Sequence, residues 1–130
     1  MTQKSLLEKW HQIVFNKELE ALHGVLADDV EFRSPFVWKP YRGRQPAFII
    51  LSTVIEVFTD FTYHRELIPG PTWALEFSAQ VDKLSIKGID LIQWNEHQEI
   101  AAFEVFVRPF NGLQLLGNEM TRRLKEKGLI

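Results

Sequence analysis

The stretch from Trp73 to Arg108 decides the fold, because it contains three runs rich in β-branched and aromatic residues. The runs are WALEFSAQV (73–81), LSIKGIDLIQW (84–94) and IAAFEVFVR (100–108), and polar turns separate them. Runs of this composition between turn residues are typical of strands. The stretch therefore predicts three consecutive antiparallel strands that form a meander.

The turn between the first two runs predicts how they pair. If Asp82 and Lys83 form a two-residue hairpin turn, Leu75 lies opposite Asp90. Side chains alternate between the two faces of a strand, so Asp90 then shares a face with apolar side chains. These apolar neighbours are Leu75, Phe77, Ala79, Val81, Ile86, Ile92 and Trp94. A carboxyl group on an apolar face is the first candidate functional residue.

The second turn, residues 95–99, predicts a three-residue loop in which Trp94 pairs with Ile100. In that register Asp90 lies opposite Glu104. The same face continues at every second position with Phe106 and Arg108. The opposite face carries an apolar patch that needs a cover, formed by Ile89, Leu91, Phe103, Val105 and Val107. A slip of one residue would exchange the two sets.

Composition limits the classes of function. With 130 residues, the chain is expected to form one domain, residues 1–130. A net charge of −2 argues against nucleic acid as a partner, because no basic stripe is present. The absence of cysteine excludes disulfides and cysteine-bound metal, and the four histidines lack metal-ligand spacing, so we expect no metal and no cofactor. A polar amino terminus and the lack of a long apolar segment predict a cytoplasmic protein without a membrane partner.

The rest of the chain predicts helices that precede and follow the sheet. In order, we expect a helix at 2–15, a second helix after Asn16 that ends at 27–29, a strand at 30–34, a third helix entered at Arg44, a strand at 61–68, the meander, and a closing helix at 110–127. This order predicts an α+β fold in which three N-terminal helices and a C-terminal helix wrap a curved antiparallel sheet. Such a cone holds either a cavity for an apolar small molecule or a core filled by its own side chains.

Three segments resemble the NTF2-like superfamily, and within it the SnoaL-like and ketosteroid-isomerase-like members. They are LADDVEFRSP (26–35), YRGR (41–44) and GIDLIQWNEH (88–97), and the resemblance covers nearly the full chain. It implies a cone-shaped α+β barrel. It also implies a homodimer, which agrees with the apolar patch expected on the outer face of the meander.

The resemblance implies a role for Asp90. Ketosteroid isomerases keep a carboxylic acid protonated on the matching strand, where it donates a hydrogen bond to the developing oxyanion. The same enzymes use a tyrosine on the first helix and an aspartate before the proline of the first strand, and the matching residues here are Trp10 and Ser34. An indole only donates, and a serine does not take an α-proton without activation, so both positions depart from the pattern.

SnoaL-like cyclases use an acid/base pair in the same cone, which implies Asp90 with Glu104 or His64 as catalytic candidates. A second group of residues is expected to line the cone and bind the ligand. The expected ligand-binding residues are Trp10, Phe32, Ser34, Phe36, Trp38, Tyr41, Ile92, Phe106 and Arg108.

Three functions remain open from the sequence. The first is a protein that binds a small hydrophobic molecule and acts as an isomerase, cyclase or hydratase through Asp90-centred acid/base chemistry. The second is a non-catalytic binding module, in which Arg108 holds an anion or Asp90 donates to a carbonyl. The third is a dimerisation module with a filled cone, and a cavity beside Asp90 would exclude it.

Overall fold

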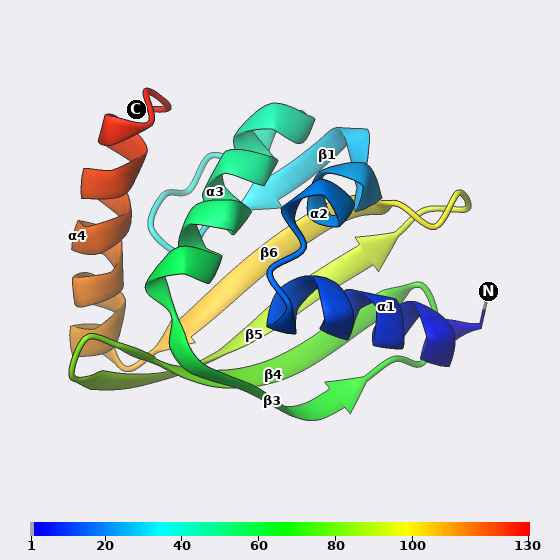
Figure 1. Ribbon diagram of the computed structural model, residues 1–130, viewed down its shortest axis with the longest axis horizontal. Helices are drawn as coiled ribbons and strands as arrows, with labels where there is room; N and C mark the ends of the chain where they lie inside the picture. The colour runs from blue at the N-terminus through cyan, green and yellow to red at the C-terminus, as the bar shows by residue number, and fades with distance from the viewer. Residues whose placement is uncertain (1) are drawn as a thin grey trace.

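The computed structural model describes residues 2–130 (Figure 1). Its elements are α1 (Gln3–Phe15), α2 (Leu19–Val25), β1 (Leu26–Arg33), β2 (Tyr41–Arg42), α3 (Arg44–Val57), β3 (Thr59–Leu67), β4 (Thr72–Val81), β5 (Leu84–Trp94), β6 (Ile100–Arg108) and α4 (Phe110–Glu126). The predicted α+β order is confirmed. The short strand β2 was not predicted from the sequence, and β1 begins four residues earlier than expected because Leu26 and Ala27 are buried and extended.

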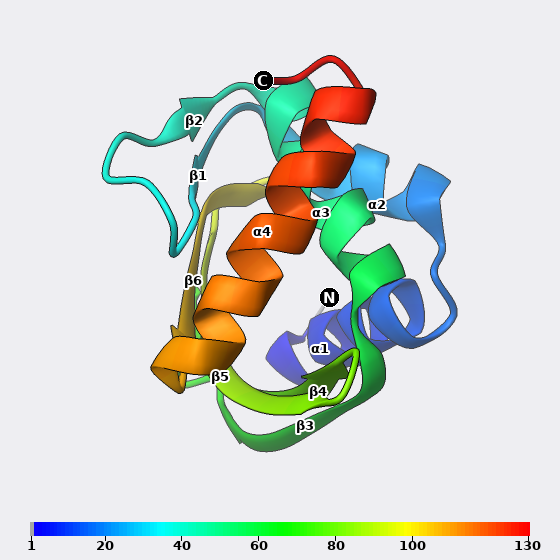
Figure 2. The same cartoon turned by 90° about the vertical axis from the view of Figure 1, so that its left-hand side faces the viewer.

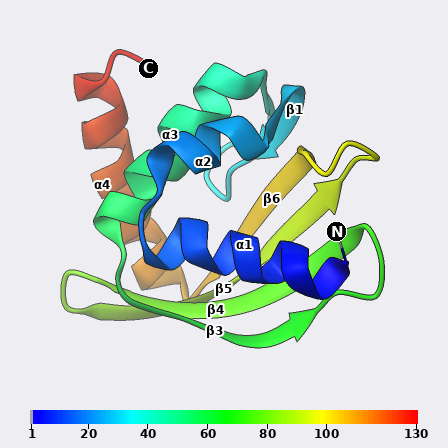
Figure 3. The same ribbon diagram turned by 45° about the vertical axis from the view of Figure 1, so that its right-hand side comes forward.

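The strands form one sheet in the order β2-β1-β6-β5-β4-β3. All neighbours are antiparallel except β1 and β6, which run parallel. Figure 2 shows that the sheet curves strongly around α1, α3 and α4, and that α4 crosses one end of it. In Figure 3, α1 lies across the sheet and α2 lies between α1 and α3. The helices therefore cover the concave face, and the convex face is left open.

The helix α1 is capped at both ends and packs on the sheet through one side. Thr2 is its N-cap, and the hydroxyl of Thr2 accepts a hydrogen bond of 3.0 Å from the backbone N–H of Ser5. Asn16 is the C-cap of this helix. The prediction that Asn16 begins the second helix is wrong, because the N-cap of α2 is Glu18. Leu6, Trp10 and Ile13 form the buried side of α1. Their spacing of three and four residues keeps these side chains on one stripe toward the sheet.

The predicted register of the first hairpin is confirmed, with Leu75 opposite Asp90. In the second hairpin Trp94 pairs with Ile100 as predicted, but the ladder shifts by one residue between Gln93 and Trp94. As a result Asp90 lies opposite Val105, and the predicted pairing of Asp90 with Glu104 is wrong. The shift has a packing reason. Ile100 and Phe103 are both buried although they are three residues apart, a spacing that a regular strand of period two does not allow.

This shift exchanges the two faces of β6. Phe103 is buried beneath the helices, and Val105 follows it on the same face. The prediction that both residues belong to the outer apolar patch is therefore wrong. The side chains of Glu104, Phe106 and Arg108 turn instead to the convex face. Among residues 2–130, no helix combines the length and the apolar composition that crossing a membrane requires.

Candidate functional site

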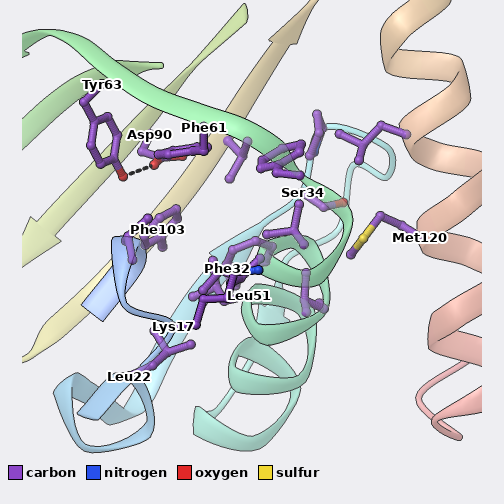
Figure 4. A pocket seen from close by; sticks show the side chains of 18 of the residues that line it. Lys17, Leu22, Phe32, Ser34, Leu51, Phe61, Tyr63, Asp90, Phe103 and Met120 are labelled. Carbon is purple, nitrogen blue, oxygen red and sulfur yellow. Dashed lines mark hydrogen bonds between the residues drawn. The ribbon is translucent and has the colours of Figure 1, made fainter. Parts of the chain in front are cut away.

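A cavity of about 410 Å³ lies between the concave face of the sheet and the helices. Figure 4 shows side chains from the sheet, α3 and α4 converging on this space. The walls are mostly aliphatic and aromatic, and the aromatic part includes Trp10, Phe15, Phe32, Phe36, Phe58, Phe61 and Phe103. An apolar hollow of this volume with a few polar groups is typical of small-molecule sites. The filled cone that the sequence left open is therefore excluded.

Three polar side chains form a hydrogen-bonded chain at one end of the cavity. The indole Nε1–H of Trp10, on α1, donates to the hydroxyl oxygen of Tyr63, on β3, over 3.0 Å. The Tyr63 hydroxyl in turn donates to Oδ2 of Asp90, on β5, over 2.8 Å (Figure 4). Three elements far apart in the sequence therefore supply one continuous array.

Burial decides the charge of this array. Asp90 is 7% exposed, and desolvation raises the pKa of its carboxyl group to about 7, against the opposing effect of the Tyr63 hydrogen bond. Desolvation, followed by the charge of Asp90, also raises the pKa of Tyr63 well above its usual value. At neutral pH, Tyr63 is therefore a neutral donor. Asp90 is present in both forms, and its protonated form can donate a hydrogen bond to a ligand oxygen.

Aromatic rings hold Tyr63 in place. Phe61 meets its ring edge-on at a centroid distance of 4.9 Å, and His11 stacks on it at 5.7 Å. His11 is itself fixed by a hydrogen bond between its Nε2 and Oε2 of Glu66. These contacts keep the Tyr63 hydroxyl aimed at Asp90, which preorganises the array.

Other polar groups lie farther along the cavity wall. The cavity-lining residues with ionisable side chains are Lys17, Asp60, Tyr63 and Asp90. Ser34 also lines the wall, and its hydroxyl oxygen accepts a hydrogen bond of 3.3 Å from the backbone N–H of Phe36. Tyr63, Asp60 and Lys17 were missed from the sequence. Alternation with Phe61 was a signal for Tyr63, because two aromatic residues at spacing two favour the same inward face.

The structure gathers only part of the predicted set around Asp90. Trp10, Phe32, Ser34 and Phe36 line the cavity with it. The other expected wall residues lie elsewhere. Ile92 is fully buried in the core, Tyr41 is half-buried on β2, and Trp38 is 91% exposed in the loop before β2.

Four predicted residues lie on the wrong face for the cavity. Glu104, Phe106 and Arg108 face outward because of the ladder shift in β6. His64 is exposed on the convex side, where its Nε2 lies 2.7 Å from the hydroxyl oxygen of Ser78. His64 follows the inward-facing Tyr63, so alternation turns it away. An acid/base pair of Asp90 with Glu104 or His64 does not form.

The chain resembles several solved structures. A steroid delta-isomerase from Pseudomonas aeruginosa shares 43% identity over 98% of this chain and 95% of its own, with a TM-score of 0.91. A bacterial protein with a cystatin-like fold from Silicibacter pomeroyi shares 35% identity over 92% of this chain and 85% of its own, with a TM-score of 0.87. An NTF2-like protein from Burkholderia xenovorans shares 16% identity over 83% of this chain and 84% of its own, with a TM-score of 0.70. This likeness concerns the fold. A scan against protein-family models found no match, and a search of curated proteins found none either.

Proposed function

Since this chain belongs to the NTF2-like superfamily, we propose that its cavity binds a hydrophobic ketone and acts on it as an isomerase-type enzyme. The observation that carries the proposal is Asp90, a carboxyl group buried in an apolar cavity and hydrogen-bonded to Tyr63. The similarity to a steroid delta-isomerase supports a substrate with a fused-ring, apolar body.

Asp90 is the donor of the proposed site, and Tyr63 positions it by donating its own hydrogen bond to Oδ2 of Asp90. In its neutral form Asp90 donates to the carbonyl oxygen of the ligand, and the hydrogen bond strengthens as that oxygen gains negative charge. Ketosteroid isomerases supply a second, phenolic donor from the position of Trp10. In this chain the indole of Trp10 donates to Tyr63, so the phenol in the array comes from β3 and not from α1.

The proposed reaction moves a double bond into conjugation with a ketone. Removal of a proton between the carbonyl group and the double bond produces an oxyanion, which the neutral carboxyl group of Asp90 stabilises by donating a hydrogen bond. Removing one such donor typically lowers kcat by about 10²- to 10³-fold. The cavity volume of about 410 Å³ lies within the range of small-molecule sites.

A second candidate function is ligand binding without turnover. The observation that favours it is Ser34, which stands where the related enzymes carry their carboxylate base. A hydroxyl group does not accept an α-proton at neutral pH unless another group activates it. In this case Asp90 holds the carbonyl oxygen of a ligand and no proton is removed.

Binding and turnover with a β,γ-unsaturated ketosteroid separate the two functions. At a hundred times its Kd, a ligand that binds only the folded state adds about 2.7 kcal/mol of stability, which a thermal-shift assay detects. Turnover is followed by the ultraviolet absorbance of the conjugated product. We expect wild type to show both signals, and Asp90→Ala, which removes the donor, to retain binding while its kcat falls by about 10²-fold or more.

Glu104→Gln is the matched control, because it removes a carboxylate from the opposite face of the sheet. We expect this variant to keep the wild-type kcat. Binding without product in the wild type would support the non-catalytic function. The absence of both signals with ketosteroids and with smaller enones would refute the proposed ligand class.

We further propose that two copies of the chain pair through the convex face of the sheet. Ile89, Leu91 and Phe106 are apolar and exposed there. Arg65, Glu76, Lys87 and Arg108 surround a shallow hollow on the same face, so the surface offers both signs of charge. A two-fold interface brings the same patch of both copies together, so this surface can pair apolar residues with each other and charges with charges of opposite sign.

A further inference from the structure

Asp60 lies at a bulge in β3, on the wall of the cavity. The ladder to β4 is irregular between Thr59 and Thr62, where Asp60 and Phe61 together oppose the single residue Ala79. The backbone φ of Asp60 is 52°, in the left-handed region that favours glycine. A glycine is the usual residue at such a position of a bulge, so an aspartate here carries a conformational cost.

The bulge explains how Asp60 reaches the cavity. Phe61 and Tyr63 both face the cavity, and alternation along a regular strand would turn Asp60 to the opposite side. The extra residue breaks this alternation, and Asp60, which is exposed to solvent, lies among the residues that line the cavity. Asp60 and Tyr63 are three residues apart on β3, so at most about 10 Å separates their Cα atoms, and both line the same cavity.

Asp60 is also the remaining proton acceptor on the wall. Lys17 presents an ammonium group, which only donates. Tyr63 and Asp90 form the donor array, and Ser34 is a hydroxyl. Within residues 2–130, the Asp60 carboxylate makes no hydrogen bond or ion pair that would occupy it. The Asp60 carboxylate is exposed and lines the cavity, so a ligand can reach it, and left-handed backbone at a residue other than glycine is often found at functional sites.

We infer that Asp60 is the base that removes and returns the proton in the isomerisation proposed for this cavity, an inference that rests on that proposed function. The C–H bond between the carbonyl group and the double bond breaks, and its proton passes to an Oδ atom of Asp60. The electron pair moves into the conjugated system and onto the carbonyl oxygen, which Asp90 hydrogen-bonds. Asp60 then returns the proton to the far carbon of the former double bond. The conjugated ketone forms and Asp60 is again ionised, without any further reactant.

Two substitutions of Asp60 and one control test this role. Asp60→Asn keeps the size of the side chain and tolerates a left-handed backbone, but it cannot accept the proton. Asp60→Gly removes the side chain and relieves the backbone. Asp82→Gly is the control, because Asp82 also has a left-handed φ, 55°, in the turn between β4 and β5, and it does not line the cavity.

We expect both Asp60 variants to bind the β,γ-unsaturated ketosteroid in the thermal-shift assay and to lose about 10²-fold or more in kcat. Asp60→Gly should nevertheless melt at a higher temperature than wild type. Asp82→Gly should also melt at a higher temperature, with kcat unchanged. The same proteins are tested for exchange of the α-hydrogens of a saturated ketosteroid with D₂O, which needs proton removal but no return to a second carbon.

The outcomes separate this inference from the proposed function. Wild-type kcat and wild-type exchange in both Asp60 variants, together with loss of activity in Asp90→Ala, would overturn the role of Asp60 and leave the isomerase function standing. Binding without turnover or exchange in the wild type would overturn both. A lower melting temperature of Asp60→Gly would show that the aspartate stabilises the bulge, and with unchanged kcat it would assign Asp60 a structural role.

Discussion

At the scale of single residues, Asp90 is a carboxyl group whose surroundings favour its neutral form. Its pKa rises from 3.8 in the unfolded chain to about 7 in the folded protein, mainly through desolvation. Between these two values the folded state keeps a proton that the unfolded state has released. Stability therefore falls as pH rises through this window. A carboxyl group that weakens the fold at neutral pH suits a site whose purpose is ligand chemistry.

Asp90→Asn should remove this pH-dependent cost. The amide oxygen still accepts the Tyr63 hydrogen bond, and an amide carries no charge to desolvate. Because each pKa unit corresponds to about 1.4 kcal/mol, we expect the variant to gain a few kcal/mol relative to wild type between pH 4 and pH 8. Urea unfolding of both proteins across this range measures the difference, in which all other titrating groups cancel. Parallel stability curves would show that Asp90 is ionised in the native state.

Tyr63→Phe should raise the pKa of Asp90 further, because the lost hydrogen bond stabilises the charged form. It also leaves the Trp10 indole without its acceptor, which should cost about 1–3 kcal/mol of stability. A carboxyl-carbon NMR titration of Asp90 measures the pKa, and urea unfolding measures the stability. Tyr41→Phe is the control, since Tyr41 is the other tyrosine and lies outside the cavity. An unchanged or lower pKa in Tyr63→Phe would refute the hydrogen-bond geometry.

At the scale of elements, β5 depends on Gly88 to pack against its neighbours. A Cβ at this position would lie 2.2 Å from the carbonyl oxygen of Phe106 and 2.5 Å from the ring of Phe77. Phe77 stacks on Phe61 at a centroid distance of 5.2 Å, and Phe61 lines the cavity. The missing side chain of Gly88 therefore leaves room for the Phe77 ring, which packs behind the cavity-lining Phe61.

Gly88→Ala should destabilise the protein by about 1–3 kcal/mol, because strand β6 or the Phe77 ring must move. Urea unfolding gives the loss. Gly24→Ala is the matched control in α2, where a Cβ meets nothing within 4 Å and alanine favours the helix by up to about 1 kcal/mol. If both variants gained stability equally, the close approach at Gly88 would be wrong.

At the scale of the whole molecule, the two faces of the sheet have different tasks. The concave face encloses the cavity beneath α1, α3 and α4, and the convex face carries exposed apolar residues among charges. Glu76 is nearly buried on this convex face, where hydrogen bonds from Arg65 and Lys87 hold its pKa well below the usual range. This charged network lies beside the apolar patch.

Phe106→Lys should weaken the proposed pairing of two chains through the convex face. Phe106 is 50% exposed. In a two-fold interface, a lysine at this position lies close to the same lysine of the other copy or to the surrounding cations, and these like charges repel. Sedimentation velocity should show a dimer for wild type and a shift to monomer for the variant. Trp38→Lys, which changes an exposed aromatic residue outside the sheet, should remain dimeric. Wild-type monomers at micromolar concentration would contradict the interface.

Local pattern determined much of this protein. Period-two runs and a two-residue turn predicted the meander and the inward position of Asp90, because alternation along β4 and β5 has no interruption. Helical spacing predicted α1, α3 and α4 and their order around the sheet. Segments in which every residue obeys one period can be predicted from the sequence alone.

Tertiary packing decided which other residues reach the cavity. Irregular pairing in β3 places Asp60 among the residues that line the cavity, and alternation after Tyr63 turns His64 outward. The ladder shift in β6 sends Glu104 and Arg108 to the convex face. A bulge reverses every later side chain of its strand, and its position depends on which buried residues the neighbouring strands and helices must accommodate. The sequence by itself determined the elements and the central carboxyl group. The three-dimensional packing determined the partners of that carboxyl group, because one inserted residue changes a face without changing the composition of the strand.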